Sequence, residues 1–471
     1  MKPADIIARL RELQAGDLPT QGGRTMAYVY DSGIAEADAL GKQALAMHSA
    51  ANGLDPTAFS SLLVMEKEIV EFAKPMLHAP DSAVATVTSG GTESILLAVK
   101  TARDANRQIE KPVMIVPDSI HSAFHKAGQY FLVERISVPV DPVTKHAVPE
   151  AMIAAMDEYK DRVVLVAASA PSYAHGVIDP IAQIAAAANE RGIRMHVDAC
   201  IGGWILPWIE EVETKWDFSV PGVTSISADL HKYAYTPKGV SLLFHRDPEL
   251  RKAQYFASAD WPGYTMLNST MQSTKSGGPL AAAWAVVNYF GNEGYRRLAR
   301  SAFDATKDLA NGISTTEHLS LIAQPESTLI AFTTDDSLDV FTLSDEMLDL
   351  GWFVQPQMSF KEHPASIHLT VSAATAGSIK EFLEALSTAV EKSVSAGPIV
   401  VDEGLRAAAQ SIAPEDLDDE AFAGLLELAG LGGNGEVEIP ERMAPVNALL
   451  DVAPVELRAA LLVAFLDRLT R

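Results

Sequence analysis

A lysine whose surroundings suit Schiff-base chemistry lies near the middle of the chain. Lys232 directly follows His231 and stands between two apolar runs, residues 222–226 and 240–244. A lysine held between two buried strands is poorly solvated. Burial then lowers the pKa of its amine and frees it to attack a carbonyl carbon. The alternative is a solvated lysine in a surface loop, so the assignment depends on what else the chain carries.

A carboxylate at the end of a predicted strand is the second candidate. The run from Ile193 ends its apolar stretch at Asp198 and continues into small residues and the pair Gly202-Gly203. Ligands bind at the carboxyl ends of the strands in α/β sheets. A carboxylate there can pair with the protonated ring nitrogen of pyridoxal 5'-phosphate (PLP) and keep the ring an electron sink. The alternative is an aspartate that caps the next helix.

A glycine-rich turn supplies a place for the cofactor phosphate. Ser89-Gly90-Gly91-Thr92 opens a segment whose apolar residues recur at helical spacing. Glycines let the backbone approach an anion closely, and the free N–H groups and dipole of a helix start attract it. Neither pattern of the common nucleotide-binding loops is present. We therefore expect Gly90, Gly91 and Thr92 to hold a phosphate.

An imidazole completes the set. His121 follows Pro117 at a predicted strand-to-helix junction, where its ring could stack on a pyridine ring, although a core or helix-capping histidine is the simpler explanation for one residue alone. The four features occur in the order phosphate cradle, stacking histidine, ring-nitrogen aspartate and Schiff-base lysine. Asp198 and Lys232 are 34 residues apart, which leaves room for a helix and a return strand. Together they predict a PLP site.

Further stretches carry a resemblance to a known family. They are residues 87–96, 175–180, 196–203, 222–229, 231–233, 237–239, 260–261, 277–278 and 289–295. In these the chain resembles the group II PLP-dependent decarboxylases, and within them the sphingosine-1-phosphate lyase branch. The resemblance implies the type I PLP-dependent transferase (aspartate aminotransferase-like) α/β fold, PLP as cofactor, and a homodimer with shared active sites.

The resemblance also implies roles for individual residues. Tyr30 matches a lyase tyrosine near the substrate phosphate, and Asn52 and Lys238 match other contacts of the substrate head group. Tyr173 matches a tyrosine placed to assist catalysis, and His231 joins the cofactor-binding residues. A packing role for Tyr30 remains the alternative.

Two stretches depart from the lyase pattern. Ser273 and Thr274 stand where a Gly-Ser pair of the family reaches the cofactor phosphate of the neighbouring subunit, so we expect them to bind PLP across a dimer. Asp55 stands where the lyases carry a phosphate-binding histidine. A carboxylate at that position in the substrate site disfavours a phosphate dianion.

Two enzymatic functions and one non-catalytic function remain open. The first is a lyase that cleaves a β-hydroxy amine, phosphorylated or not, into an aldehyde and an amine by a retro-aldol reaction. The second is an amino-acid decarboxylase of the same family. A non-catalytic protein of this fold is disfavoured, because all the cofactor residues are in place.

The order of the predicted elements divides the chain. Residues 1–60 read as a helix and an irregular arm, and 61–299 as a large PLP-binding domain in which apolar strands alternate with helices, which predicts a mostly parallel sheet covered on both faces. Residues 300–471 read as a smaller α/β domain, interrupted by an acidic insertion at about 399–441. The acidic run by itself is typical of a solvated helix and loop.

Composition limits the partners. The 37 Lys and Arg against 61 Asp and Glu leave a net charge of −24, which disfavours nucleic acid and anionic lipid. The one cysteine, Cys200, excludes an intrachain disulfide framework and fits the cytoplasm. No targeting segment or run of 18 uncharged apolar residues is visible, so we expect no membrane span. The expected partner is a small amine or amino acid, and no metal site is expected.

Overall fold

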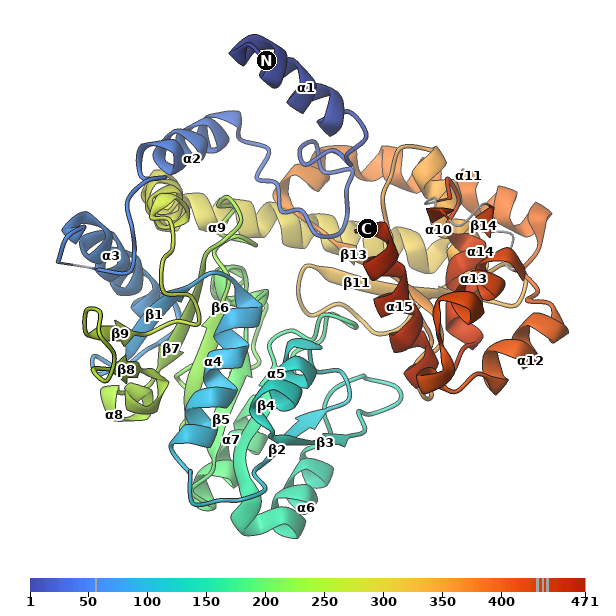
Figure 1. Ribbon diagram of the computed structural model, residues 1–471. Helices are drawn as coiled ribbons and strands as arrows, with labels where there is room; N and C mark the ends of the chain where they lie inside the picture. Colours follow the sequence, from blue (N-terminus) through green and yellow to red (C-terminus); the bar gives the residue numbers. More distant parts are fainter. Residues whose placement is uncertain (56, 429–431, 434–435, 438–439, 471) are drawn as a thin grey trace.

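The computed structural model describes residues 1–55, 57–428, 432–433, 436–437 and 440–470, and its largest element is a seven-stranded sheet (Figure 1). The strands are β1 (Val84–Thr88), β2 (Val113–Pro117), β3 (Glu134–Val138), β4 (Val163–Ser169), β5 (Arg194–Asp198), β6 (Val223–Ala228) and β7 (Ser241–His245). Their order is β1-β7-β6-β5-β4-β2-β3. Strand β7 runs antiparallel to both of its neighbours, and the strands of the other four pairs are parallel. The predicted mostly parallel sheet is confirmed.

Helices cover both faces of this sheet, as the continuous apolar strands require. Every residue of β2 and β4 is buried. Helices α4 (Gly91–Asp104) and α5 (Ala123–Phe131) lie over the near face in Figure 1, and α7 (Ile181–Glu190) lies on the far face, where it packs against α6 (Pro149–Tyr159). The alternation of strand and helix brings the strand ends that precede α4, α5 and α7 to one edge of the sheet.

A long helix leads from the large sheet to a smaller one. Helix α9 (Gly278–Thr315) is interrupted at Gly291, whose φ is 53°, in the left-handed region that glycine adopts without strain. A four-stranded antiparallel sheet follows, of order β10-β11-β13-β12. Its strands are β10 (Leu319–Leu321), β11 (Leu329–Thr334), β12 (Gln355–Gln357) and β13 (Ser366–Thr370), and helices α10 (Val340–Asp349) and α11 (Ile379–Ala396) pack with it. Trp352 and Phe382 lie edge to face in this second core.

The remaining segments lie around these two sheets. Helix α2 (Ala35–Met47) packs on α9, whereas α1 (Pro3–Gln14) has no buried residue. Helix α3 (Ser60–Met76) packs on α9 as well. Short helix α8 (Pro248–Arg251) precedes a hairpin of β8 (Phe256–Ser258) and β9 (Met266–Asn268). In the described part of the chain, no helix has both the length and the apolar character that crossing a bilayer needs.

The C-terminal segment forms a helical unit with its own apolar cluster. Its helices are α12 (Glu403–Ser411), α13 (Asp419–Leu428), α14 (Ala444–Val452) and α15 (Val455–Leu469), with the short strands β14 (Gly432–Gly433) and β15 (Glu436–Val437) between α13 and α14. Phe422 of α13 packs with Leu457 and Leu461 of α15. The predicted insertion at 399–441 and its acidic run therefore contain helices that pack on the terminal helix. Its exact limits stay a prediction, because residues 429–431, 434–435 and 438–439 lie outside the described part.

Candidate active site

One cavity, of about 360 Å³, collects most of the predicted cofactor residues. Its lining includes Gly90, Gly91, Thr92, His121, Tyr173, Asp198, His231 and Lys232. Asp198 ends β5, and the other residues lie in the segments that follow strands: Gly90 after β1, His121 after β2, and Lys232 after β6. The cavity therefore lies at the carboxyl ends of the strands, where ligands bind in this class of sheet.

The glycine turn forms a cradle at the start of α4. A Cβ atom on Gly91 would lie 2.6 Å from Asp229 Oδ2 and 2.7 Å from Cys200 Sγ, so no residue with a side chain fits there. Glu93, in the first turn of α4, accepts a hydrogen bond from the backbone N–H of Ser89 at 2.6 Å and another from Met271 at 2.7 Å. Glu93 thus ties the cradle to the segment before Ser273. Sequence reasoning gave Glu93 no role, although a glutamate in a first helical turn is a known capping signal.

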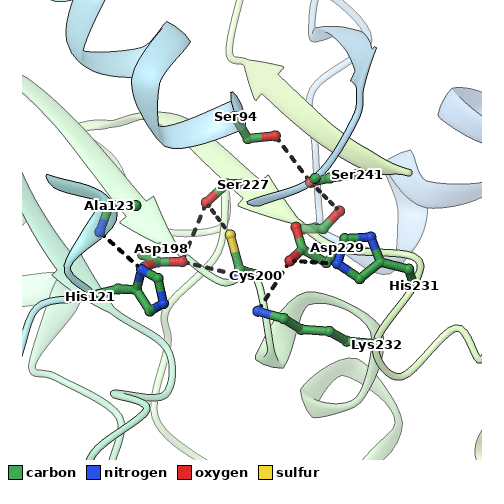
Figure 2. A network of polar contacts seen from close by, with 12 residues as sticks. Ser94, His121, Ala123, Asp198, Cys200, Ser227, Asp229, His231, Lys232 and Ser241 are labelled. Atoms are coloured by element: carbon green, nitrogen blue, oxygen red, sulfur yellow. Dashed lines mark hydrogen bonds and ion pairs between the residues drawn. The ribbon is translucent and has the colours of Figure 1, made fainter. Parts of the chain in front are cut away.

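Lys232 has a buried counterion that we did not predict. Its Nζ lies 3.1 Å from Oδ2 of Asp229, which is also 3.5 Å from Nε2 of His231 (Figure 2). The side chain of Asp229 is only 1% exposed. Burial, the largest single influence, lowers the pKa of Lys232, as expected, but the charge of Asp229 together with Tyr30, Cys200 and Asp198 outweighs it, and the net shift is upward. The expectation of a depressed lysine pKa is therefore wrong, because a carboxylate within ion-pair distance favours the charged amine.

Asp198 lies on the opposite side of the cavity from this ion pair. Its Oδ1 accepts hydrogen bonds from the backbone N–H of Cys200 at 3.1 Å and from the hydroxyl of Ser227 at 3.5 Å (Figure 2). The Cys200 thiol donates to the same Ser227 hydroxyl at 3.2 Å. These contacts fix the carboxylate at the end of β5, in the cavity lining. The predicted packing role of Cys200 agrees with its burial.

Aromatic side chains line the cavity near Asp198. Nδ1 of His121 accepts a hydrogen bond from the backbone N–H of Ala123 at 3.1 Å, which fixes the imidazole at the start of α5. Burial lowers the pKa of His121, so its ring is neutral and suited to stacking. The ring of Tyr173 stands edge-on to it at 6.5 Å and stacks on His368 of the small sheet at 4.0 Å. Burial raises the pKa of the Tyr173 phenol, so it stays protonated and can donate.

Two further predicted residues lie beside Lys232 rather than in the cavity wall. Tyr30 lies close enough for the charge of Lys232 to act on its phenol, whose pKa burial raises. The ammonium of Lys238 lies 5.0 Å above the ring of Tyr30 and donates to the backbone oxygen of Tyr28 at 2.8 Å. Burial and the charge of Lys232 lower the pKa of Lys238 to about 8. Both residues therefore lie near enough to Lys232 to feel its charge.

Four predicted residues do not reach this cavity within one chain: Asn52, Asp55, Ser273 and Thr274. They gather instead where residues 51–53 pair with residues 275–277 through the bonds Gly53 N to Lys275 O and Gly277 N to Ala51 O, both 2.8 Å. Asp55 is exposed there, and its Oδ1 accepts from the backbone N–H and the hydroxyl of Thr57 at 2.8 and 2.6 Å. These bonds lower the pKa of Asp55, so the carboxylate is ionised at neutral pH.

The cavity fits PLP. The backbone at Gly90 and Gly91 starts α4, where free N–H groups attract a phosphate. The buried Asp229 carboxylate, whose Oδ1 has no hydrogen-bond partner among the described residues, pairs with the amine that would carry the cofactor. The Asp198 carboxylate is suited to pair with the ring nitrogen of PLP, the His121 imidazole to stack on the face of the ring, and the Lys232 amine to form a Schiff base. When bound, PLP supplies an electron sink that stabilises negative charge at the carbon bearing the substrate's amine.

Comparison with known proteins agrees with this geometry. Residues 24–335 match the family model described as the pyridoxal-dependent decarboxylase conserved domain. Residues 403–468, which cover the C-terminal helical unit, match a model described as the C-terminal putative HTH domain of pyridoxal-dependent enzymes.

The relatives of this chain include sphingosine-1-phosphate lyases. The enzyme of Dictyostelium discoideum is 36% identical over 353 residues, which cover 74% of this chain and 65% of that protein. The enzyme of Oryza sativa is 34% identical over 416 residues, 85% of this chain and 74% of that one. This chain thus spans about two thirds of the length of such relatives.

Solved structures give the same fold. The sphingosine-1-phosphate lyase of Burkholderia pseudomallei superposes with a TM-score of 0.77 at 33% identity, covering 84% of this chain and 92% of that one. The glutamate decarboxylase of Lactobacillus brevis superposes with a TM-score of 0.76 at 22% identity, over 85% and 94% of the two chains, and shows the shared fold alone. The predicted fold class and the predicted cofactor are confirmed, and the chain belongs to the pyridoxal-dependent decarboxylase family.

Proposed function

We propose that this protein is a PLP-dependent carbon–carbon lyase, which cleaves a β-hydroxy amine into an aldehyde and an amine. The observation that carries this reaction is the pair of phenols, Tyr30 and Tyr173, beside the amine of Lys232. A retro-aldol cleavage needs groups that hold and deprotonate the β-hydroxyl, whereas a decarboxylation does not. The similarity to sphingosine-1-phosphate lyases at 34–36% identity supports the same choice.

The protonation state of each residue determines the role that we propose for it. Tyr30 and Tyr173 have raised pKa values, so they donate hydrogen bonds that orient the substrate hydroxyl. Lys232 would hold PLP through its amine, which lies beside these phenols. Because Asp229 makes this amine more basic, it is suited to take up the hydroxyl proton.

Product analysis tests this function. Purified enzyme with PLP is given sphingosine 1-phosphate, unphosphorylated sphingosine and common amino acids in separate reactions. We expect a long-chain aldehyde from a β-hydroxy amine and no carbon dioxide from the amino acids. Because the ionised Asp55 disfavours a dianion, we expect a smaller preference for the phosphorylated substrate than a histidine at this position would give. Release of carbon dioxide without any aldehyde establishes the decarboxylase instead.

We also propose a homodimer with shared active sites. Asn52, Asp55, Ser273 and Thr274 lie together but away from the cavity of their own chain, next to a strongly apolar surface. That surface comprises the exposed side chains Phe256, Trp261, Tyr264, Leu267 and Met271 around the β8–β9 hairpin and Leu63 and Val64 of α3. Figure 1 shows the hairpin and α3 on the same side of the molecule. An exposed apolar area of this kind is typical of a protein interface. A second copy of the chain that packs on this face would have these four residues beside its own cavity.

Mixing two inactive variants tests the shared site. Lys232→Ala removes the Schiff-base amine, and Thr274→Asp puts a negative charge where we expect the cofactor phosphate of the partner. In mixed dimers one of the two sites combines an intact Lys232 with an intact Thr274. We expect recovery of about a quarter of the wild-type activity after random exchange of subunits. No recovery, together with a fully active monomer in sedimentation, contradicts the shared site.

A further inference from the structure

A loop of the small domain reaches over the large domain beside the active site. Residues 358–365 join β12 to β13, and they turn tightly because Phe360 and His363 exchange two backbone hydrogen bonds, of 3.0 and 2.9 Å. Lys361 lies at the tip of this turn with a φ of 53°. A non-glycine residue in the left-handed region is held there by its surroundings. The contacts of the Lys361 side chain identify these surroundings.

Lys361 forms an ion pair at the end of β2, just before His121, the predicted stacking histidine. Its Nζ lies 2.8 Å from both carboxylate oxygens of Asp118, whose side chain is only 4% exposed. Asp118 follows the last residue of β2 and precedes His121 by three residues. Removing the cation would leave a buried carboxylate without its closest partner, at the base of the segment that presents His121 to the cavity.

The same loop supports the opposite wall. Nδ1 of His363 lies 3.5 Å from Nζ of Lys145, and its ring lies 5.0 Å from that of His175. His175 is two residues beyond Tyr173, which lines the cavity. One short loop therefore supports both segments that bear the aromatic groups of the site.

The C-terminal helical unit, residues 403–469, holds the other end of the loop. Oδ1 of Asp451 in α14 accepts from the backbone N–H of Ser359 at 2.6 Å and from its hydroxyl at 2.8 Å. Arg458 in α15 donates to the backbone oxygen of Ser359 at 3.3 Å and to that of Asp451 at 2.8 Å. Between residues 403 and 468, 13 Asp and Glu stand against four Lys and Arg, a balance that disfavours nucleic acid as its partner.

We propose that the C-terminal helical unit positions the cofactor site of its own chain through a polar relay, in which Asp451 holds Ser359 and Lys361 holds Asp118. Lys361 and Asp451 are positioning residues, since neither lines the cavity. The relay acts on the PLP site itself, whichever substrate bond the enzyme cleaves.

PLP affinity therefore tests the relay without any turnover. The variants are Lys361→Met, Asp451→Ala and their combination, and the matched controls are Lys380→Met and Asp336→Ala, exposed residues of the small domain. PLP is titrated into the cofactor-free proteins and followed by the visible circular dichroism of the bound ring. We expect each relay variant to weaken PLP binding about tenfold and to alter the dichroism, with both controls unchanged. The double variant is expected to be no weaker than the weaker-binding single variant, because both changes break one path.

Conservative variants separate positioning from loss of fold. Lys361→Arg keeps the charge opposite Asp118 and is expected to restore most of the affinity. Ser359→Ala removes one of the two bonds to Asp451 and is expected to give a smaller loss with an unchanged melting temperature. The relay is refuted if Lys361→Met binds PLP as tightly as Lys380→Met does, or if the losses of Lys361→Met and Asp451→Ala simply multiply.

Discussion

Replacing Lys232 with alanine is expected to abolish turnover and the covalent trapping of PLP by borohydride. Lys232 is the lysine in the cavity wall that also contains the phosphate cradle and Asp198. Without its amine, the cofactor has no Schiff base with the protein, and the substrate loses the base proposed for its hydroxyl proton. We expect kcat to fall by at least about 10³-fold, which corresponds to about 4 kcal/mol of barrier. Mass spectrometry after borohydride reduction measures the trapped cofactor.

Lys232→Arg separates the chemistry from the electrostatics. A guanidinium keeps a positive charge near the buried Asp229, but it stays protonated and cannot form the Schiff base. We expect this variant to fold normally and to remain inactive. Lys252→Ala removes an exposed lysine that pairs with Glu249 on α8, and it should retain full activity. If Lys232→Ala retained wild-type turnover, the assignment of the cofactor site would be wrong.

The mostly parallel sheet could be predicted because its signals are local. Strands buried on both faces require continuous apolar runs, so Val113–Pro117 and Val163–Ser169 are readable without their neighbours. In a parallel sheet the strand ends share one edge, so residues far apart in sequence, such as Gly90, Asp198 and Lys232, could be placed in one site. The roles of these residues toward PLP stay predictions until they are tested in solution.

The electrostatics of the site depend on distances that a sequence does not contain. Asp229 stands three residues before Lys232 in the Asp-Leu-His-Lys run, yet that spacing alone does not say whether their side chains meet. In the structure they approach to 3.1 Å, and the pKa of the lysine rises instead of falling. An acidic residue one helical turn before a candidate Schiff-base lysine is the signal that could have suggested this pair.

Contacts between segments that lie far apart along the chain could not be predicted from the sequence either. Asp118 and Lys361 are 243 residues apart, and Ser359 and Asp451 are 92 apart. No periodicity or motif links such pairs, so the acidic C-terminal segment looked like a solvated insertion. Ser273 and Thr274 are a similar case, because the contacts predicted for them lie on a second copy of the chain.

Replacing Asp198 with alanine is expected to lower activity by at least about 100-fold and to weaken PLP retention. The carboxylate ends β5 inside the cavity, where it is held by Cys200 and Ser227. With PLP bound, we expect it to pair with the protonated ring nitrogen. Truncating one member of a buried charge pair costs on the order of 3–5 kcal/mol, and each 1.36 kcal/mol of barrier is about tenfold in rate. Equilibrium dialysis of PLP and steady-state kinetics measure the two effects.

Asp198→Asn distinguishes the loss of charge from the loss of structure. An asparagine oxygen can still accept the backbone bond from Cys200, so the end of β5 should keep its shape, but the negative charge is gone. We expect this variant to keep its melting temperature and still lose most of its activity. Asp217→Asn is the matched control, because Asp217 is a buried carboxylate that pairs with His78 and does not line the cavity. Near-normal turnover of Asp198→Asn with PLP bound would show that the charge of Asp198 is not what activates the ring.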